Sequence, residues 1–148
     1  MAEHTTTLRE AIEAIEEHLR DDLPDLAIIQ GDPVTGPATL PQQRGAVGFA
    51  VRRELTRNLG ENRNQLNTRV EDLVIVELQK RISPKDQLES RGDVWDKERD
   101  VINRVTELSF NRRWNLVFVD TRDLIRGGEW FTVLIRFSLK RFLEVGAG

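Results

Sequence analysis

The feature of the sequence that most constrains the fold is an alternation of apolar and polar residues near the C-terminus. Between residues 128 and 142, apolar side chains alternate with polar ones: Phe131, Val133, Ile135, Phe137 and Leu139 against Thr132, Arg136, Ser138 and Lys140. Successive side chains of a β-strand point to opposite faces of a sheet. The pattern therefore predicts a strand with one face in the core. Gly127-Gly128 predicts the turn that pairs it, as a hairpin, with a strand over residues 113–121.

Two upstream segments also alternate, and a third is a short apolar run. In residues 47–55, one face is predicted to carry Val47, Phe49, Val51 and Leu55, with Arg52 and Glu54 opposite. In residues 69–82, the shared face is Val70, Val74, Val76, Leu78 and Ile82, with Leu73 and Ile75 on the other. The polar residues 56–68 between them predict a long, mobile hairpin loop. Residues 26–30 predict a short buried strand, and the Pro- and Gly-containing residues 31–45 a loop.

Two segments have helical periodicity. Over residues 6–20 the apolar stripe is Leu8, Ala11, Ile12, Ile15 and Leu19, and Thr7 with Glu10 resembles a capping box. Over residues 93–110 it is Val94, Val101, Ile102, Val105 and Leu108, with Ser90 or Asp93 as the expected cap. The order αβββαββ predicts one α+β domain over residues 1–148, a mainly antiparallel sheet with two helices packed on one face. Residues 1–5 and 144–148 are expected to be frayed.

Composition narrows the function classes. The chain has no cysteine and two histidines among its 148 residues, which excludes thiolate catalysis, disulfides and Cys-type zinc sites. The net charge of −3 argues against a dedicated nucleic-acid binder. The longest apolar run, residues 73–76, is far shorter than a membrane span, and no signal peptide is visible. We therefore expect a soluble protein made in the cytosol, without a cofactor, that is not a classical enzyme.

Arginine dominates the basic residues, at 18 of 22. Its planar guanidinium suits paired contacts with carboxylates at protein interfaces. A GC-rich genome that favours Arg codons explains the same bias. Composition alone leaves both explanations open.

One group of residues resembles a catalytic centre. Metal-dependent nuclease cores also follow an αβββαβ order, and here Glu71, Asp72, Glu77 and Lys80 lie on one predicted strand. Such a site needs carboxylates that hold Mg²⁺ and a lysine beside them. Glu77 and Lys80 are three residues apart, so they are predicted to point to opposite faces. We interpret the group as an exposed strand edge with mixed charges and expect no metal site.

The aromatic residues and histidines give weaker signals. Trp114 shares a face with Leu116 and Phe118 and is expected in the core, whereas Trp130 falls on the polar face and Trp95 near a helix start. Exposed Trp near Arg is typical of interfaces, although a Trp that covers a sheet edge is equally consistent. His18 is interpreted as a helix-surface histidine without partner ligands.

The segment 72–88, Asp-Leu-Val-Ile-Val-Glu-Leu-Gln-Lys-Arg-Ile-Ser-Pro-Lys-Asp-Gln-Leu, followed by a helix, resembles the tail-terminator (tail-completion, minor tail) proteins of long-tailed phages. The closing hairpin, with Arg-Trp-Asn-Leu-Val-Phe-Val-Asp over residues 113–120 and Gly-Glu-Trp-Phe-Thr-Val-Leu-Ile-Arg-Phe over residues 128–137, is similar to theirs too. The resemblance covers residues 8–142. Head–tail connectors and stoppers of the virion neck have similar sizes and mixed folds.

The resemblance implies a virion structural protein at the tail–neck junction. Its copies would form a ring, commonly a hexamer, that caps the tail tube and joins the tail to the head. The implied partners are further copies of the chain, the tail tube protein and a head-completion or neck protein, with no membrane, no sequence-specific nucleic acid and no catalytic residues. The alternatives are a connector or stopper of the neck and a divalent-metal-dependent nuclease.

Polar and aromatic side chains on the outer strand faces and in the loop are the expected contacts with a neighbouring subunit or the tube. They are Arg52, Arg53, Arg57, Asn62, Arg63, Asn64, Arg69, Trp95, Trp130 and Arg136. Within this set, Arg57 and Arg63 are expected to reach carboxylates of a neighbour, because the predicted loop around them becomes ordered on assembly.

Overall fold

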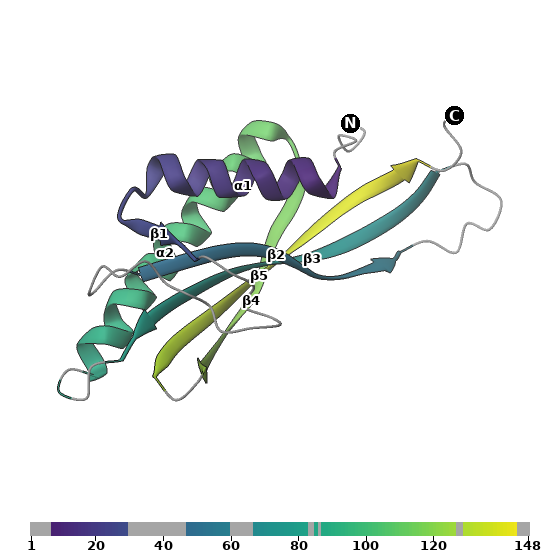
Figure 1. Ribbon diagram of the computed structural model, residues 1–148. Coiled ribbons are helices and arrows are strands. Elements are labelled where there is room, and N and C mark those ends of the chain that lie inside the picture. Colours follow the sequence, from purple (N-terminus) through teal and green to yellow (C-terminus); the bar gives the residue numbers. More distant parts are fainter. Residues whose placement is uncertain are drawn as a thin grey trace.

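A computed structural model describes residues 7–29, 47–59, 67–82, 85, 87–126 and 129–144. Over these residues the elements are α1 (Leu8–Asp22), β1 (Leu26–Ile28), β2 (Val47–Asn58), β3 (Asn67–Arg81), α2 (Gln87–Arg112), β4 (Asn115–Arg126) and β5 (Trp130–Glu144) (Figure 1). The predicted order αβββαββ and the α+β class are confirmed. Gly127-Gly128, the loop residues 31–45, and the chain ends 1–5 and 145–148 lie outside the described residues.

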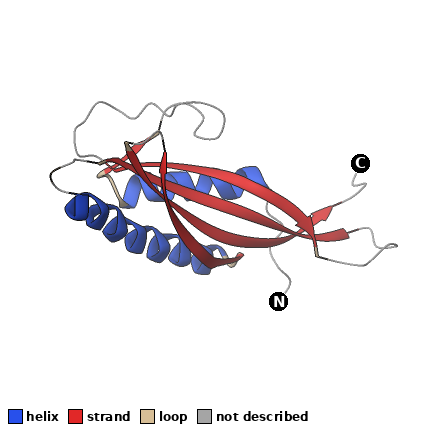
Figure 2. Cartoon of the chain, turned by 90° about the horizontal axis from the view of Figure 1, so that it is seen from below, coloured by secondary structure: helices blue, strands red, loops and turns tan. Residues whose placement is uncertain are grey.

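The strands form one sheet with the order β1-β2-β3-β5-β4. The pairs β2–β3, β3–β5 and β4–β5 are antiparallel, and β1 runs parallel to β2. Both helices pack against the same face, and β2, β3 and β5 extend beyond them toward the C-terminal end of the chain (Figures 1 and 2). The long strands β3 and β5 lie side by side in the interior of the sheet, and β4 forms one edge.

The helix-covered face carries the core, as the alternation in β5 predicts. Its side chains are almost fully buried in one cluster with the inner stripes of both helices: Phe49, Val74, Val76, Leu78, Phe131, Val133, Ile135, Phe137 and Leu139 with Ala11, Ile15, Leu19, Val94, Val101, Val105 and Leu108. Trp114 packs partly buried against this cluster, as expected. Burial of side chains this large provides most of the free energy that favours the folded state.

The strands β2 and β3 differ from their predicted form in length and register. β2 continues to Asn58 and β3 begins at Asn67, so Thr56 and Arg57 pair with Asp72 and Glu71 rather than lying in a loop. A register shift between Arg53 and Leu55 inserts one extra residue. Such a bulge reverses which face the following side chains point to. Leu55 therefore pairs with Leu73 on the face opposite Val51, and its predicted place beside Val51 was wrong.

The helix α2 begins earlier than its apolar stripe indicates. It starts at Gln87, so neither Ser90 nor Asp93 is a cap; Ser90 is buried within the first turns and Asp93 bonds Lys80 of β3. It ends where Arg113 adopts a φ of 57°, which lets Trp114 N donate to Ser109 O at 3.0 Å. In α1 the predicted cap is confirmed, since Thr7 Oγ1 accepts from Glu10 N at 3.1 Å. Within the described residues, no helix is long and apolar enough to cross a membrane.

Candidate functional site

The second face of the sheet, opposite the two helices, gathers five of the seven predicted interface residues that the structure describes. The pairing registers place Arg52, Arg57, Arg69, Trp130 and Arg136 on it. Arg53 pairs with Val74 and so belongs to the helix-covered face, beyond the helices. Trp95 lies in α2, also on the helix side. Asn62, Arg63 and Asn64 lie outside the described residues.

Basic side chains outnumber acidic ones on this second face. The registers place Arg52, Arg57, Arg69, Arg122, Arg136 and Lys140 along it, and Arg81 and Arg126 beside Trp130 at one end. The acidic side chains described there are Glu71, Glu77 and Asp120, and Glu54 at the bulge adds a fourth carboxylate that reaches Arg136 at 3.6 Å. We call this surface the basic face. The positive charge of the basic face is opposite in sign to the net charge of the whole chain, which is −3.

Glu77 is the most deeply buried charge of the basic face, with no exposed area. Its Oε1 accepts from Arg52 Nη2 at 3.3 Å and from Arg126 Nη2 at 3.0 Å, and its Oε2 accepts from Gln79 Nε2 at 2.7 Å. A carboxylate is retained in such a position only when it is paired and hydrogen-bonded. The two guanidiniums and the amide satisfy it within the subunit.

Glu71, on the same strand, is held in a similar way. Ser138 Oγ donates to its Oε2 at 2.6 Å, and Arg57 donates to its Oε1. The Ser138 hydroxyl and the Arg57 guanidinium together lower the pKa of the Glu71 carboxyl, against the opposite effect of burial. Arg57 thus lies in β2 and binds Glu71 of its own chain, rather than lying in a loop as expected. Its contact with a carboxylate of a neighbour stays a prediction.

Arg136 forms a further ion pair of the basic face. Its Nε donates to Asp120 Oδ1 at 2.6 Å, and its Nη2 donates to the second oxygen of the same carboxylate. This two-point contact lowers the pKa of Asp120 and raises that of Arg136. Arg136 is one-third exposed, so it remains at the surface while oriented by Asp120.

Asp72 shows why the nuclease-like group does not converge. It pairs with Leu139 on the helix-covered face, where Arg141 Nε donates to it at 2.5 Å and Thr56 Oγ1 also donates. Glu77 lies on the other face, and Lys80 bonds Asp93 of α2. The predicted separation of Glu77 and Lys80 is confirmed. The interpretation as an exposed edge was wrong, because β3 is a central strand and Glu71, Asp72 and Glu77 are buried.

Trp95 and Trp130 take different roles. The Trp95 indole donates to Asp123 Oδ2 at 3.3 Å, and its ring meets Phe131 edge-on at 6.0 Å between centroids. It covers the end of the core while 38% of it stays exposed. Trp130 pairs with Arg81 and Arg126 at the end of the basic face. Both tryptophan side chains are thus partly exposed.

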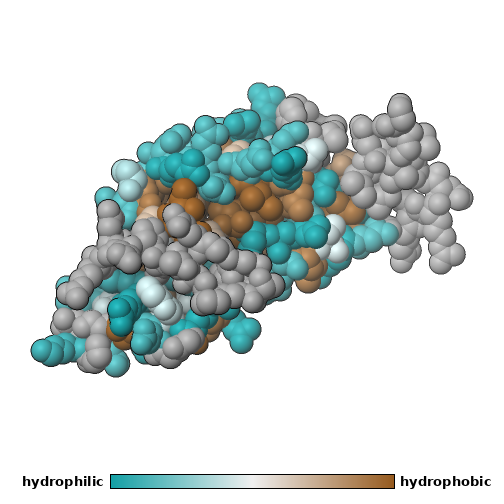
Figure 3. Space-filling model, in the orientation of Figure 1, coloured by the Kyte–Doolittle hydropathy of each residue, from teal (hydrophilic) through white to brown (hydrophobic). Residues whose placement is uncertain are grey.

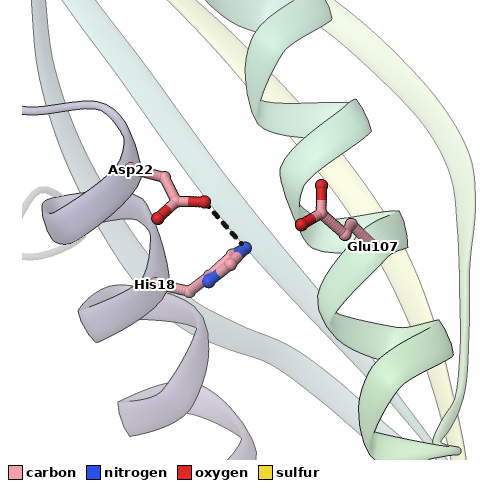
Figure 4. A group of neighbouring side chains, drawn as sticks. All are labelled: His18, Asp22 and Glu107. Atoms are coloured by element: carbon pink, nitrogen blue, oxygen red, sulfur yellow. Dashed lines mark ion pairs between the residues drawn. The ribbon is translucent and has the colours of Figure 1, made fainter.

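His18 has acidic neighbours, which corrects its interpretation as a histidine without partners. Its Nε2 lies 3.4 Å from Asp22 Oδ2, and Glu107 of α2 approaches the same pair (Figure 4). One ligand atom from each of the three residues lies within 4.8 Å of the others, so imidazole and carboxylate groups that could hold a metal ion meet here. Glu107 also accepts from Arg104 at 3.1 Å, and both carboxylates are at the surface. These are equally the contacts of an ion-pair cluster between two helices.

Several residues that the structure places at the surface of β4 were not predicted from the sequence. Val117, Val119 and Ile125 are exposed on β4, at 52%, 46% and 49%. Asp120, Arg122 and Arg126 join the basic face from the same strand. Their signal was obscured because a second bulge, between Phe118 and Asp120, breaks the alternation of β4.

Comparison with known proteins adds no assignment. No model of a known protein family matches this chain, and no curated protein shows significant similarity to it.

Proposed function

We propose that this chain is a structural protein of the virion of a long-tailed phage, a tail-terminator-type subunit. Copies of the chain form a ring, a hexamer, that caps the tail tube and joins the tail to the head. Its partners are its own copies, the tail tube protein and a head-completion or neck protein, and it needs no cofactor. The proposal rests on the resemblance of segment 72–88 and of the closing hairpin, together with the surfaces described above.

The observation that carries the proposal is the mixed apolar and charged surface at the edge strand β4. Val117, on the basic face, and Val119, at the bulge, are each about half exposed there, whereas Ile125 pairs with Phe131 and lies on the helix-covered face. Apolar side chains bordered by charged ones are typical of protein interfaces. A ring subunit needs such a surface, because it meets a neighbour on each side.

The nuclease alternative has less support from the same residues. Its minimal requirement is that Asp72 and Glu77 meet at one metal ion. They point to opposite faces of β3, and each is bound by arginine. The chemistry of the buried acids thus favours a role in holding the sheet together.

Native mass spectrometry of the purified chain, alone and with tail tube protein, tests the proposal. We expect a closed oligomer of identical subunits, and we expect Val117→Asp combined with Val119→Asp to reduce it to monomers. The matched control is Leu88→Asp, which changes a 77% exposed leucine on α2 and should leave the oligomer intact. A chain that stays monomeric at every concentration, with and without tube protein, would contradict the proposal.

A further inference from the structure

The outward side of α1 is as acidic as the opposite face of the sheet is basic. Ala11, Ile15 and Leu19 are buried, and Glu10, Glu13, Glu17 and Asp21 recur at helical spacing on the other side, all exposed. We call these four residues the acidic stripe. Figure 3 shows hydrophilic surface along this side of α1. Among the described residues, Glu17 and Asp21 form no ion pair, whereas Glu13 of the stripe pairs with Arg9 at 3.3 Å.

The basic face and the acidic stripe lie on opposite sides of one molecule, because α1 covers one face of the sheet and the basic residues project from the other (Figure 1). They therefore cannot meet within a subunit, whereas they can meet between two copies. The stripe runs from Glu10 to Asp21, about 16 Å along α1. Same-face residues of the long strands recur every 6–7 Å or so, close to the spacing of the stripe along the helix. The two surfaces match in sign and in spacing.

We propose that the basic face of one subunit binds the acidic stripe of α1 in a second copy of the chain. This inference rests on the proposed function, and it names the surfaces through which the ring forms. The two surfaces are different, so the contact is heterologous and repeats head to tail around a ring. Val117, which pairs with Ser138 on the basic face, supplies an apolar contact within it.

Joining the edge strands is a less suitable way to connect subunits. The edge strand β4 carries a bulge between Phe118 and Asp120, and the half of β2 that β1 leaves uncovered carries one between Arg53 and Leu55. Bulges and charges on edge strands are the devices by which proteins prevent strands of two molecules from pairing. A contact between the basic face and the acidic stripe needs no backbone pairing between edge strands of two subunits.

Nucleic acid is the other occupant that a basic surface could take. Phosphate binding is favoured by a surrounding field of positive sign. The acidic α1 and the negative net charge work against it. A second copy, which supplies carboxylates in a fixed row, fits the surface better.

A charge-exchange experiment tests the contact directly. The first variant combines Arg81→Glu and Arg122→Glu on the basic face, and the second combines Glu17→Lys and Asp21→Lys on the stripe. All four residues are exposed, so each variant should fold and melt close to the wild type. Each variant alone should associate at least about tenfold more weakly, because it places like charges against each other. An equimolar mixture should restore an oligomer of alternating subunits, which a six-membered ring accommodates.

Native mass spectrometry separates the outcomes, since the two variants differ in mass. Alternating oligomers in the mixture support the inference. If the wild type and both variants all form the same rings, the inferred contact is wrong, but the proposed ring still stands. A monomeric wild type would contradict the proposed function itself. If the wild type binds duplex DNA, the first variant loses that binding, and assembly is unaffected, the basic face is a polyanion site and the inference is wrong.

Discussion

Replacing Glu77 by glutamine should weaken the fold far more than the same change at Glu129. Glu77 has no exposed area and accepts hydrogen bonds from Arg52, Arg126 and Gln79. The neutral amide cannot offset two guanidiniums, and its NH₂ group meets the Gln79 donor. Breaking a buried ion pair costs about 3–5 kcal/mol. Arg52 and Arg126 are 20% and 33% exposed, so water recovers part of the loss. We therefore expect a loss of about 2–4 kcal/mol, in line with hydrogen bonds to charged groups of about 1.5–3 kcal/mol each.

Glu129→Gln is the matched control, because Glu129 also pairs with an arginine. Its contact with Arg81 spans 3.5 Å, with the two side chains 60% and 70% exposed. Exposed pairs of this kind contribute at most about 1 kcal/mol. Urea unfolding followed by tryptophan fluorescence measures both variants, and in thermal melts Glu77→Gln should lower Tm by roughly 4–16 °C at about 2–4 °C per kcal/mol. Equal free energies of unfolding for the two variants, within about 0.5 kcal/mol, would refute the reasoning.

Two further predictions concern the core and the pH dependence of stability. Phe137→Ala, at a residue 1% exposed, should destabilise the subunit by about 3–5 kcal/mol in the same urea assay, and a loss under 1 kcal/mol would contradict its place in the core; Val117→Ala, at a half-exposed site, should stay within about 0.5 kcal/mol. Ser138→Ala removes the main cause of the lowered pKa of Glu71. A carboxyl with a lowered pKa stabilises the fold above its unfolded pKa, about 4.3, and loses this contribution as the pH falls through its folded pKa. The stability difference between wild type and Ser138→Ala should therefore narrow below about pH 4, and a difference that stays constant from pH 7 to 3 would be the opposite result.

Local pattern was sufficient to predict the element order. The alternation from Phe131 to Leu139 and the stripe from Val94 to Leu108 each place one side of an element in the core, and the structure confirms both. Periodicity failed where the chain departs from it. The bulge between Arg53 and Leu55 moves Leu55 to the other face of the sheet. The sequence around the bulge contains no residue pattern that predicts the extra residue.

The charged network was beyond reach of local reasoning for a different reason. Glu77 is satisfied by residues 25 and 49 positions away, and Glu71 by one 67 positions away. Without the sheet register, acidic residues in a strand are readily interpreted as the solvent-exposed side chains of an edge strand. Once the order β2-β3-β5-β4 is known, Glu71 is seen opposite Arg57 and Lys140 and Asp72 opposite Thr56. Glu77 lies opposite Ala50 and Leu134, and the arginines reach it from neighbouring positions of the sheet.

Electron microscopy of the purified chain is the most direct test of the proposal that it is a ring subunit. A head-to-tail contact between different surfaces either closes into a ring or continues as a filament. We expect class averages of closed rings with six-fold rotational symmetry and a central opening. Two-fold dimers, helical filaments or isolated monomers, with or without tail tube protein present, would contradict it.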